Sequence, residues 1–161
     1  MTLTAERVRE VLDYDHRTGV FMWRVGQRKG RRAGNISPRG YRRIMVDRCM
    51  HLEHVLAWLY VYGEWPSQQI DHKDNDKANN RLSNLRLATN SQNHINKGLQ
   101  RNNTSGFKGV SWDTQIQKWR ARIKVNGVNK YVGVFDDVAA AGAARAEAER
   151  KFFGEFAYGG E

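Results

Sequence analysis

The sequence QIDHKDNDKANNRLSNLRLATNSQN, residues 69–93, decides the fold. Residues 69–72 are predicted to form a short strand, and residues 85–88, in which apolar and polar side chains alternate, a second one. The loop between them is rich in Asn and Asp. Thr89 and Gln92 have the spacing of a capping box, which predicts a helix that begins there and ends at Gly98. Strand, loop, strand and helix in this order predict an α+β fold.

The first of these strands ends on a carboxylate and an imidazole, Asp71 and His72. Neighbouring side chains on a strand point to opposite faces, so the two can serve one site only if the strand twists or ends there. A helix packed across the strand pair could bring Asn93 next to Asp71. A carboxylate with an amide oxygen suits Mg²⁺ or Mn²⁺, with positions left for water and phosphate. An isolated Asp-His pair is more often a surface hydrogen bond, so the pair alone identifies no site.

Three runs in this stretch, residues 70–77, 79–86 and 89–93, resemble the HNH homing endonucleases of bacteriophages. The resemblance extends over roughly residues 13–97. It implies two strands and a helix around one divalent metal ion, Mg²⁺ or Mn²⁺. It also implies an endonuclease that hydrolyses phosphodiester bonds in duplex DNA, as a site-specific homing or nicking enzyme. A non-catalytic DNA-binding regulator on the same scaffold and an RNA-directed nuclease are the alternatives.

The resemblance assigns a role to each motif residue. Asp71 and Asn93 would bind the metal, His72 would be the general base, and Asn84 would brace the loop. His54 stands where the family has a histidine near the site, and we expect it to assist catalysis. The third residue of the HNH motif is an asparagine in this sequence, Asn93, and not a histidine. A shift of one residue in the alignment would give its role to His94.

A basic run precedes the motif. Residues 24–43 contain eight Lys and Arg and no acid, punctuated by glycine. A solvated loop is one reading, but glycine lets backbone approach a ligand closely, which favours contact with phosphate. The residues expected to make it are Arg28, Lys29, Arg31 and Arg32. Around this run we expect a helix over 4–13, strands over 20–25 and 41–47, and a helix over 53–62.

The remainder of the chain predicts a second module. Residues 1–98 would form the nuclease domain, 99–106 a polar linker and 107–161 a DNA-binding domain. Strands are expected over 107–112, 118–125 and 129–135, followed by a helix that begins near residue 136. In the middle strand basic side chains alternate with apolar ones, so one face would be basic and the other would pack on the helix.

This second module resembles the DNA-binding domain of plant ethylene-response factors of the APETALA type, over about residues 104–157. The resemblance implies a three-stranded sheet in the major groove with a helix behind it. A polar face that is merely solvated is the alternative. The residues expected to face DNA are Lys108, Ser111, Arg120, Arg122, Lys124, Asn129 and Tyr131.

Composition supports a polyanionic partner. The 161 residues include 27 Lys and Arg against 17 Asp and Glu, a formal net charge of +10. The single cysteine excludes an internal disulfide, and no stretch approaches the roughly 20 apolar residues of a membrane span. We therefore expect a monomer that binds double-stranded DNA, has no membrane partner and works in the cytoplasm, that of the host cell if a phage encodes it.

Overall fold

The computed structural model describes residues 3–96, 99 and 102–157. The chain forms two compact units that divide between Thr89 and Asn90, and each is described here by itself. The division falls before the predicted boundary at residue 98, and the predicted linker lies partly outside the described residues. Within the described residues, no helix has both the length and the apolar character that crossing a membrane requires.

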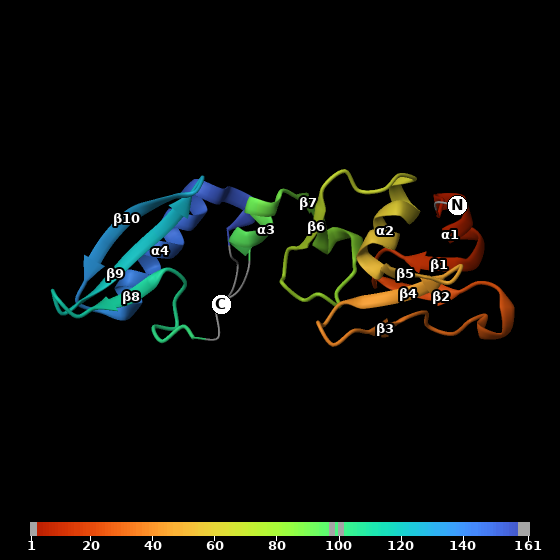
Figure 1. Cartoon of the computed structure of the whole chain (residues 1–161), viewed down its shortest axis with the longest axis horizontal. Coiled ribbons are helices and arrows are strands. Elements are labelled where there is room, and N and C mark those ends of the chain that lie inside the picture. Colours follow the sequence, from red (N-terminus) through yellow and green to blue (C-terminus); the bar gives the residue numbers. More distant parts are fainter. Residues whose placement is uncertain (1–2, 97–98, 100–101, 158–161) are drawn as a thin grey trace. The chain divides into compact units, whose positions relative to one another are not determined.

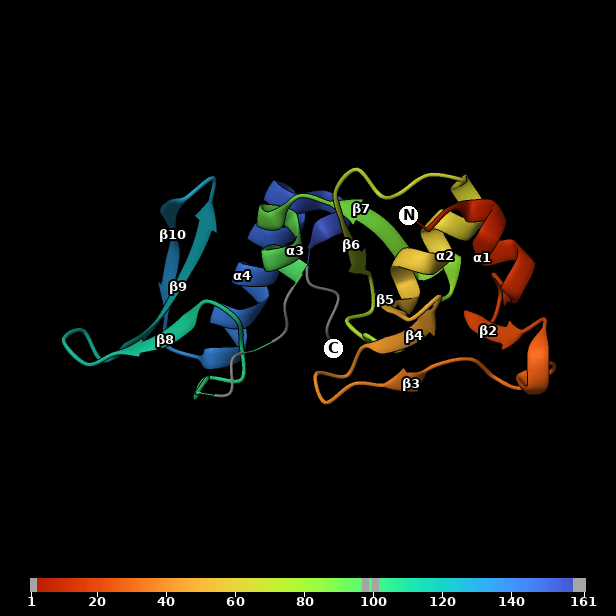
Figure 2. The same cartoon turned by 45° about the vertical axis from the view of Figure 1, so that its right-hand side comes forward.

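The N-terminal unit combines two helices with three small antiparallel sheets (Figures 1 and 2). The first sheet pairs β1 with β2, the second has the order β3-β4-β5, and the third pairs β6 with β7. The elements are α1 (Ala5–Val11), β1 (Leu12–Asp15), β2 (Val20–Trp23), β3 (Asn35–Ile36), β4 (Arg42–Val46), β5 (Cys49–Leu52), α2 (Glu53–Tyr62), β6 (Gln69–His72) and β7 (Leu85–Ala88).

The first helix is shorter than predicted. Thr4 caps α1 by accepting a hydrogen bond from the Arg7 amide, as its position suggests, but the helix ends at Val11. Leu12 already belongs to β1, where it pairs with Trp23. Leu12 continues the apolar face of the helix in sequence, so the pattern did not reveal that the same side chain fills the core from a strand. Strands β1, β3 and β5 were not predicted.

A buried ion pair lies beside the apolar core of this unit. The core includes Val8, Phe21, Ile44 and Leu56, each at most 1% exposed. Arg42 donates through Nε to Oε2 of Glu53 at 2.6 Å, and their side chains are 8% and 0% exposed. The Arg42 guanidinium also donates to the Ala33 carbonyl, so one side chain connects β4, the start of α2 and the loop before β3.

The C-terminal unit is a three-stranded antiparallel sheet with a helix across one face (Figure 1). Its strand order is β10-β9-β8, and α4 contacts all three strands. The elements are α3 (Asn90–Asn96), β8 (Val110–Asp113), β9 (Lys118–Val125), β10 (Val128–Phe135) and α4 (Val138–Phe153). Strand β8 begins later than predicted, and Asp137 caps α4 by accepting from the Ala140 amide. The predicted end of α3 at Gly98 lies outside the described residues.

The alternation predicted for the middle strand is present. Ala121 and Ile123 are buried against the helix, whereas Arg122 and Lys124 are exposed. Helix α4 packs closely against Phe107 because Gly142 has no side chain: a Cβ atom there would overlap the Phe107 ring. Helices and antiparallel sheets together confirm the predicted α+β fold class.

Breaking the Arg42–Glu53 pair on one side should destabilise the protein strongly. We expect Arg42→Met to lower the free energy of unfolding by about 3–5 kcal/mol, because Glu53 is left charged and buried. Burial raises the pKa of Glu53, and only Arg42 and weaker contacts oppose that rise. Urea denaturation followed by circular dichroism measures the effect.

The matched control is Arg7→Met, which breaks exposed ion pairs with Glu10 and Asp47 and should cost about 1 kcal/mol. The double variant Arg42→Met/Glu53→Leu should recover much of the loss. Equal costs for the two single variants would contradict the assignment of the Arg42–Glu53 pair as a core element.

Candidate active site and nucleic-acid interface

The β6–β7 hairpin positions the two motif residues on opposite faces. Asp71 pairs across the ladder with Arg86, and His72 with Leu85. Because side chains alternate along a strand, His72 shares a face with Ile70, which is part of the apolar core. The strand ends at His72, which satisfies the condition under which both residues could serve one site. Both are only 5% exposed.

Asp71 is held by an arginine that the sequence did not indicate as part of the site. Nε and Nη2 of Arg86 both donate to Oδ2 of Asp71, at 2.9 and 2.8 Å. The Arg86 side chain is 11% exposed, so the pair is well shielded from water. The two predicted strands could have revealed this pair, but only once their register was known. The two hydrogen bonds from one guanidinium fix the orientation of the Asp71 carboxylate.

His72 is held by Asn80, a second residue that the sequence interpretation missed. Nε2 of His72 lies 3.0 Å from Oδ1 of Asn80, whose residue is 1% exposed. An amide oxygen only accepts hydrogen bonds, so Nε2 of His72 is the donor in this contact. The Tyr14 hydroxyl donates to the Asn80 carbonyl at 2.6 Å and fixes the backbone at this point.

The turn between β1 and β2 braces the same loop. Gly19 has φ +73°, and a Cβ atom there would lie 2.5 Å from the carbonyl carbon of Asn80. The Leu82 amide donates to the His16 carbonyl at 3.1 Å. The first hairpin of the chain is thus in direct backbone contact with the loop that orients His72.

His54 lies beside His72, as the resemblance leads one to expect, but in an apolar setting. The two rings are 5.0 Å apart at an interplanar angle of 85°, and Tyr41 is close to both. Burial, with a smaller contribution from His72, lowers the pKa of His54 to about 3. His54 is therefore neutral at ordinary pH. Its Nδ1 is buried and has no hydrogen-bond partner among the described residues.

Asn84 braces the loop between the strands. Its Nδ2 donates to Oδ1 of Asp74 at 2.9 Å and to the Asn79 carbonyl at 2.8 Å, and its Oδ1 accepts from the Asp74 amide. Burial alone would raise the pKa of Asp74, but hydrogen bonds, first from Asn79 and then from Asn84, lower it overall. These contacts agree with the bracing role that the resemblance implies, which remains a prediction.

The metal ligand that the N-terminal unit offers, a carboxylate oxygen, fits a hard divalent cation. Asp71 offers carboxylate oxygen, and the described residues contain no group of three His, Cys, Asp or Glu side chains that could hold a metal by themselves. A Mg²⁺ or Mn²⁺ ion bound through few protein oxygens and several waters needs no such group. Asn93 belongs to α3 of the other unit, and the side chain of His94 is not described, so the Asp71–Asn93 pairing and its alternative stay predictions.

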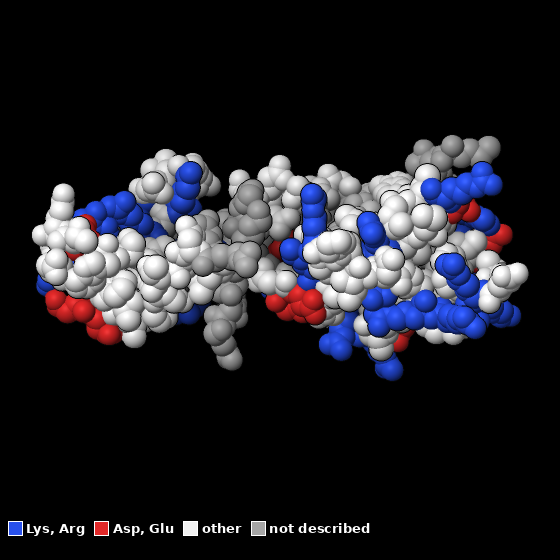
Figure 3. All heavy atoms as spheres, turned by 60° about the horizontal axis from the view of Figure 1, so that its bottom comes forward, with Lys and Arg blue, Asp and Glu red and all other residues white. Residues whose placement is uncertain are grey.

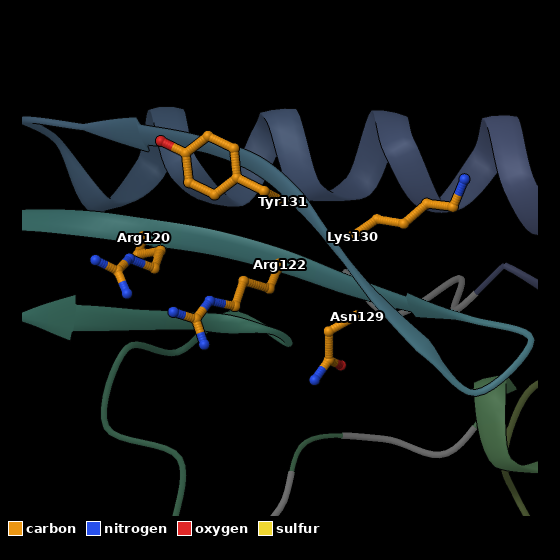
Figure 4. Close-up of a pocket in the computed structure, with 5 residues that line it drawn as sticks. All are labelled: Arg120, Arg122, Asn129, Lys130 and Tyr131. Atoms are coloured by element: carbon orange, nitrogen blue, oxygen red, sulfur yellow. The ribbon is translucent and has the colours of Figure 1, made fainter.

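In the C-terminal unit, the face of the sheet opposite α4 brings together most of the residues predicted to meet DNA. The ladder pairs Ser111 with Arg120, Tyr131 with Arg122, and Asn129 with Lys124. Figure 4 shows Arg120, Arg122, Asn129 and Tyr131 around one surface depression of about 400 Å³. Lys130 also lines it, with its ammonium group 5.1 Å from the Phe152 ring on α4.

Two expectations about this sheet need correction. Lys108 does not extend from the sheet surface: it is partly buried, its ammonium group lies 3.6 Å from Glu149 on α4, and it also donates to the Ile95 carbonyl. Burial lowers the pKa of Lys108, and Glu149 opposes that effect. Nor is the basic face free of acids, because Asp113 at the end of β8 forms an ion pair with Arg120. The sequence pattern showed the alternation but not this cross-strand neighbour.

The basic loop before β3 is exposed, as predicted. Within the described part of the chain, none of its predicted phosphate contacts forms an ion pair; these residues are Arg28, Lys29, Arg31 and Arg32. Arg24 and Arg42, at the two ends of the basic run, are instead paired with Asp13 and Glu53. Within the basic run, the cations most available to a polyanion are therefore those of the loop.

Comparison with known proteins shows what the segment around this site is similar to. The family model described as HNH endonuclease matches residues 51–95, which contain Asp71, His72, Asn84 and Asn93. This segment is therefore similar to HNH endonucleases, and nuclease activity of the whole protein is a proposal. This match does not extend to the C-terminal sheet, whose resemblance to ethylene-response factors stays a prediction.

Two viral proteins are similar to parts of the chain. "Protein 3.8" of Escherichia phage T7 is 37% identical over 75 residues, 46% of this chain and 62% of that protein. The "Uncharacterized HNH endonuclease L560" of Acanthamoeba polyphaga mimivirus is 34% identical over 110 residues, 67% of this chain and 56% of that protein. The chain thus matches less than two thirds of either relative.

A solved structure titled "DNA binding and cleavage by the HNH homing endonuclease I-HmuI" aligns with a TM-score of 0.43 and 18% identity. The alignment covers 88% of this chain and 84% of that one.

Removing the Asn80 side chain should disturb His72 specifically. We expect Asn80→Ala to lower the free energy of unfolding by about 1–3 kcal/mol, because Nε2 of His72 loses its buried partner. The proton should no longer be confined to Nε2, which ¹⁵N chemical shifts of the His72 ring report directly. DNA cleavage should slow by roughly 10–100-fold, the usual effect of losing a partner that orients a functional histidine.

The matched control is Asn79→Ala in the same loop, whose side chain bonds Asp74 and the Arg81 amide and not His72. It should leave the ring shifts of His72 unchanged. If Asn80→Ala also left them unchanged, Asn80 would have no part in orienting His72.

Proposed function

We propose that this chain is a metal-dependent endonuclease that hydrolyses phosphodiester bonds in duplex DNA, one strand at a time. One observation carries the proposal: a buried histidine, oriented by Asn80 and adjacent to the ion-paired Asp71, lies within the segment that matches the HNH endonuclease model. A single site of this kind attacks one strand, so a monomer would nick. Recognition of a defined site would come from the basic surfaces outside the hairpin.

His72 supplies the base. With a proton on Nε2 facing Asn80, Nδ1 of His72 can accept a proton from a water molecule that attacks the phosphorus atom. Asp71 and Asn93 would hold Mg²⁺ or Mn²⁺, which neutralises charge on the phosphate and the leaving oxygen when bound. Arg86 keeps the Asp71 carboxylate in place before the cation arrives. His54, neutral and buried, would pack against the His72 ring rather than exchange protons.

The C-terminal sheet would bind the duplex and determine where the nuclease acts. Arg122 and Lys124 are exposed on the same face and have no acidic partner within the described residues, whereas Arg120 is balanced by Asp113. Tyr131, 64% exposed, adds a planar side chain next to them. Since the two units belong to one chain, binding by one would raise the effective concentration of the other at nearby phosphates.

The cleavage reaction separates the roles of the two motif residues. We expect the protein to relax supercoiled plasmid with Mg²⁺ or Mn²⁺ and to stop in EDTA. His72→Ala should slow cleavage by roughly 10²–10⁴-fold with DNA affinity nearly unchanged, because the base acts on water in the transition state. Asp71→Ala should also be inactive, but a higher metal concentration should restore part of its activity and none of that of His72→Ala.

His16→Ala is the control, because this exposed histidine contributes only its backbone to the site. Undiminished cleavage in EDTA would rule out the metal-dependent mechanism. Firm DNA binding without cleavage under any metal would instead identify a DNA-binding regulator on an HNH scaffold.

A salt series tests the C-terminal sheet. If Arg122 contacts a phosphate, Arg122→Ala should flatten the plot of log affinity against log salt concentration by about 0.9, because fewer counterions are released. Fluorescence anisotropy with a labelled duplex measures this, with circular dichroism to verify folding. Lys151→Ala, an exposed cation in the last turn of α4, is the matched control and should keep the parent slope. Identical slopes for both variants would exclude the sheet as a phosphate-binding face.

A further inference from the structure

A lysine of the β6–β7 loop contacts the same aromatic ring as the candidate base. The ammonium group of Lys77 lies 5.0 Å from the centre of the Tyr41 ring. The Tyr41 ring is in turn 6.2 Å from the ring of His72 and 5.5 Å from that of His54. A single tyrosine therefore connects a cation of the loop with the imidazole that would activate water.

The position of this ammonium group is fixed although the side chain of Lys77 is exposed. Its Nζ donates to the Arg39 carbonyl at 3.3 Å, in the turn between β3 and β4. The stem of Lys77 lies over Gly40, with Cδ 3.7 Å from the point where a Cβ atom would stand. An exposed lysine usually loses rotamer freedom when it binds an anion. Here contacts within the protein have already restricted the side chain, so Lys77 is preorganised for binding.

The carboxylates nearest to Lys77 in sequence bind other groups. Oδ1 of Asp76 accepts from the Ala78 amide, and both carboxylate oxygens of Asp74 accept from amide groups of the same loop. Within the part of the chain that the structure describes, Lys77 forms no ion pair. A lysine that is held in place but not neutralised can bind an anion from outside the protein.

The surface around Lys77 favours a polyanion. Figure 3 shows Lys and Arg side chains gathered on the side of the N-terminal unit that carries β3. The turn that accepts the hydrogen bond from Lys77 follows β3 directly, and no Asp or Glu occurs over residues 16–46. Positive potential of this kind concentrates phosphate groups near the surface that produces it. Phosphates would therefore be available next to the Lys77 ammonium group.

We propose that Lys77 binds a backbone phosphate of the DNA strand that is cut, and so holds the scissile bond beside His72. A lysine acts as a point charge, which suits a phosphate approached from a single direction. Holding the reacting group close to the base can account for a large part of a rate enhancement. The Tyr41 ring keeps the lysine next to the imidazole. The inference rests on the proposed function and adds a substrate-binding residue to that site.

Removing the charge of Lys77 while keeping its stem tests the inference. Lys77→Met retains an unbranched side chain over Tyr41 and Gly40. At protein concentrations that saturate a supercoiled plasmid, with Mg²⁺, single-turnover cleavage should slow by roughly 10–100-fold, because a charge-assisted contact with phosphate is lost. In a His72→Ala background, Lys77→Met should flatten the plot of log affinity against log salt concentration by about 0.9. Lys77→Arg keeps the charge above the ring and should restore most of both quantities.

The matched control is Lys73→Met. This lysine of the same loop is also exposed, but its ammonium group donates to the Ser83 carbonyl and not to the turn between β3 and β4. Lys73→Met should keep the parent rate and the parent slope. The ¹⁵N chemical shifts of the His72 ring should report the same protonation pattern in Lys77→Met as in the parent. A lysine that only supported the Tyr41 ring would disturb that pattern when replaced.

Three outcomes overturn the inference while the parent still cleaves DNA in a metal-dependent manner. One is a parent rate and a parent slope in Lys77→Met. Another is equal losses in Lys77→Met and Lys77→Arg together with altered His72 ring shifts, which identifies a structural role. The third is a flattened slope with the parent rate, which places the contact away from the strand segment that reacts. If the parent protein neither binds nor cleaves DNA, the proposed function fails and the inference with it.

Discussion

The geometry of the candidate site depends on one fully buried side chain, Asn80. Its amide oxygen holds His72, while its backbone carbonyl accepts from Tyr14, so a single residue connects the reactive imidazole to the first hairpin of the chain. Nδ2 of Asn80 is buried without a hydrogen-bond partner among the described residues, so the contacts that fix this residue are those of its two oxygen atoms. The Asn and Asp residues around it bond mainly to each other and to the loop backbone, which makes the loop a rigid support.

Elements with a clear periodic pattern were predictable from sequence, and those defined by tertiary contacts were not. Helix α2 and strands β6 and β7 follow their apolar patterns, and Gly63 ends α2 in a left-handed conformation. Strands β3 and β5 are short and lie beside glycine-rich or polar segments, where no period can be seen. Leu12 shows the limit most directly, because its sequence position fits a helix while its pairing partner places it in a strand.

The same distinction applies to the candidate site. A family resemblance singles out Asp71, His72 and Asn84; their roles stay predictions, and the structure shows which side chains hold them. Arg86 and Asn80 were not, because their importance comes from register and from loop geometry. Lys108 is the converse case: its charge suggested a nucleic-acid contact, but a buried carboxylate on α4 attracts it away from the sheet surface. Charge patterns therefore indicate which face is basic, and not which side chains remain available.

Gly19 has a consequence for how such a gene behaves in a living host. Any side chain at this position would meet the backbone of Asn80, and the backbone conformation there already favours glycine. Almost every substitution of Gly19 would thus displace the backbone of Asn80, which holds His72, although Gly19 lies more than fifty residues from His72 in sequence. For the proposed nuclease, selection against activity would therefore recover inactivating changes at this glycine as well as at the motif itself, although Gly19 carries no reactive group.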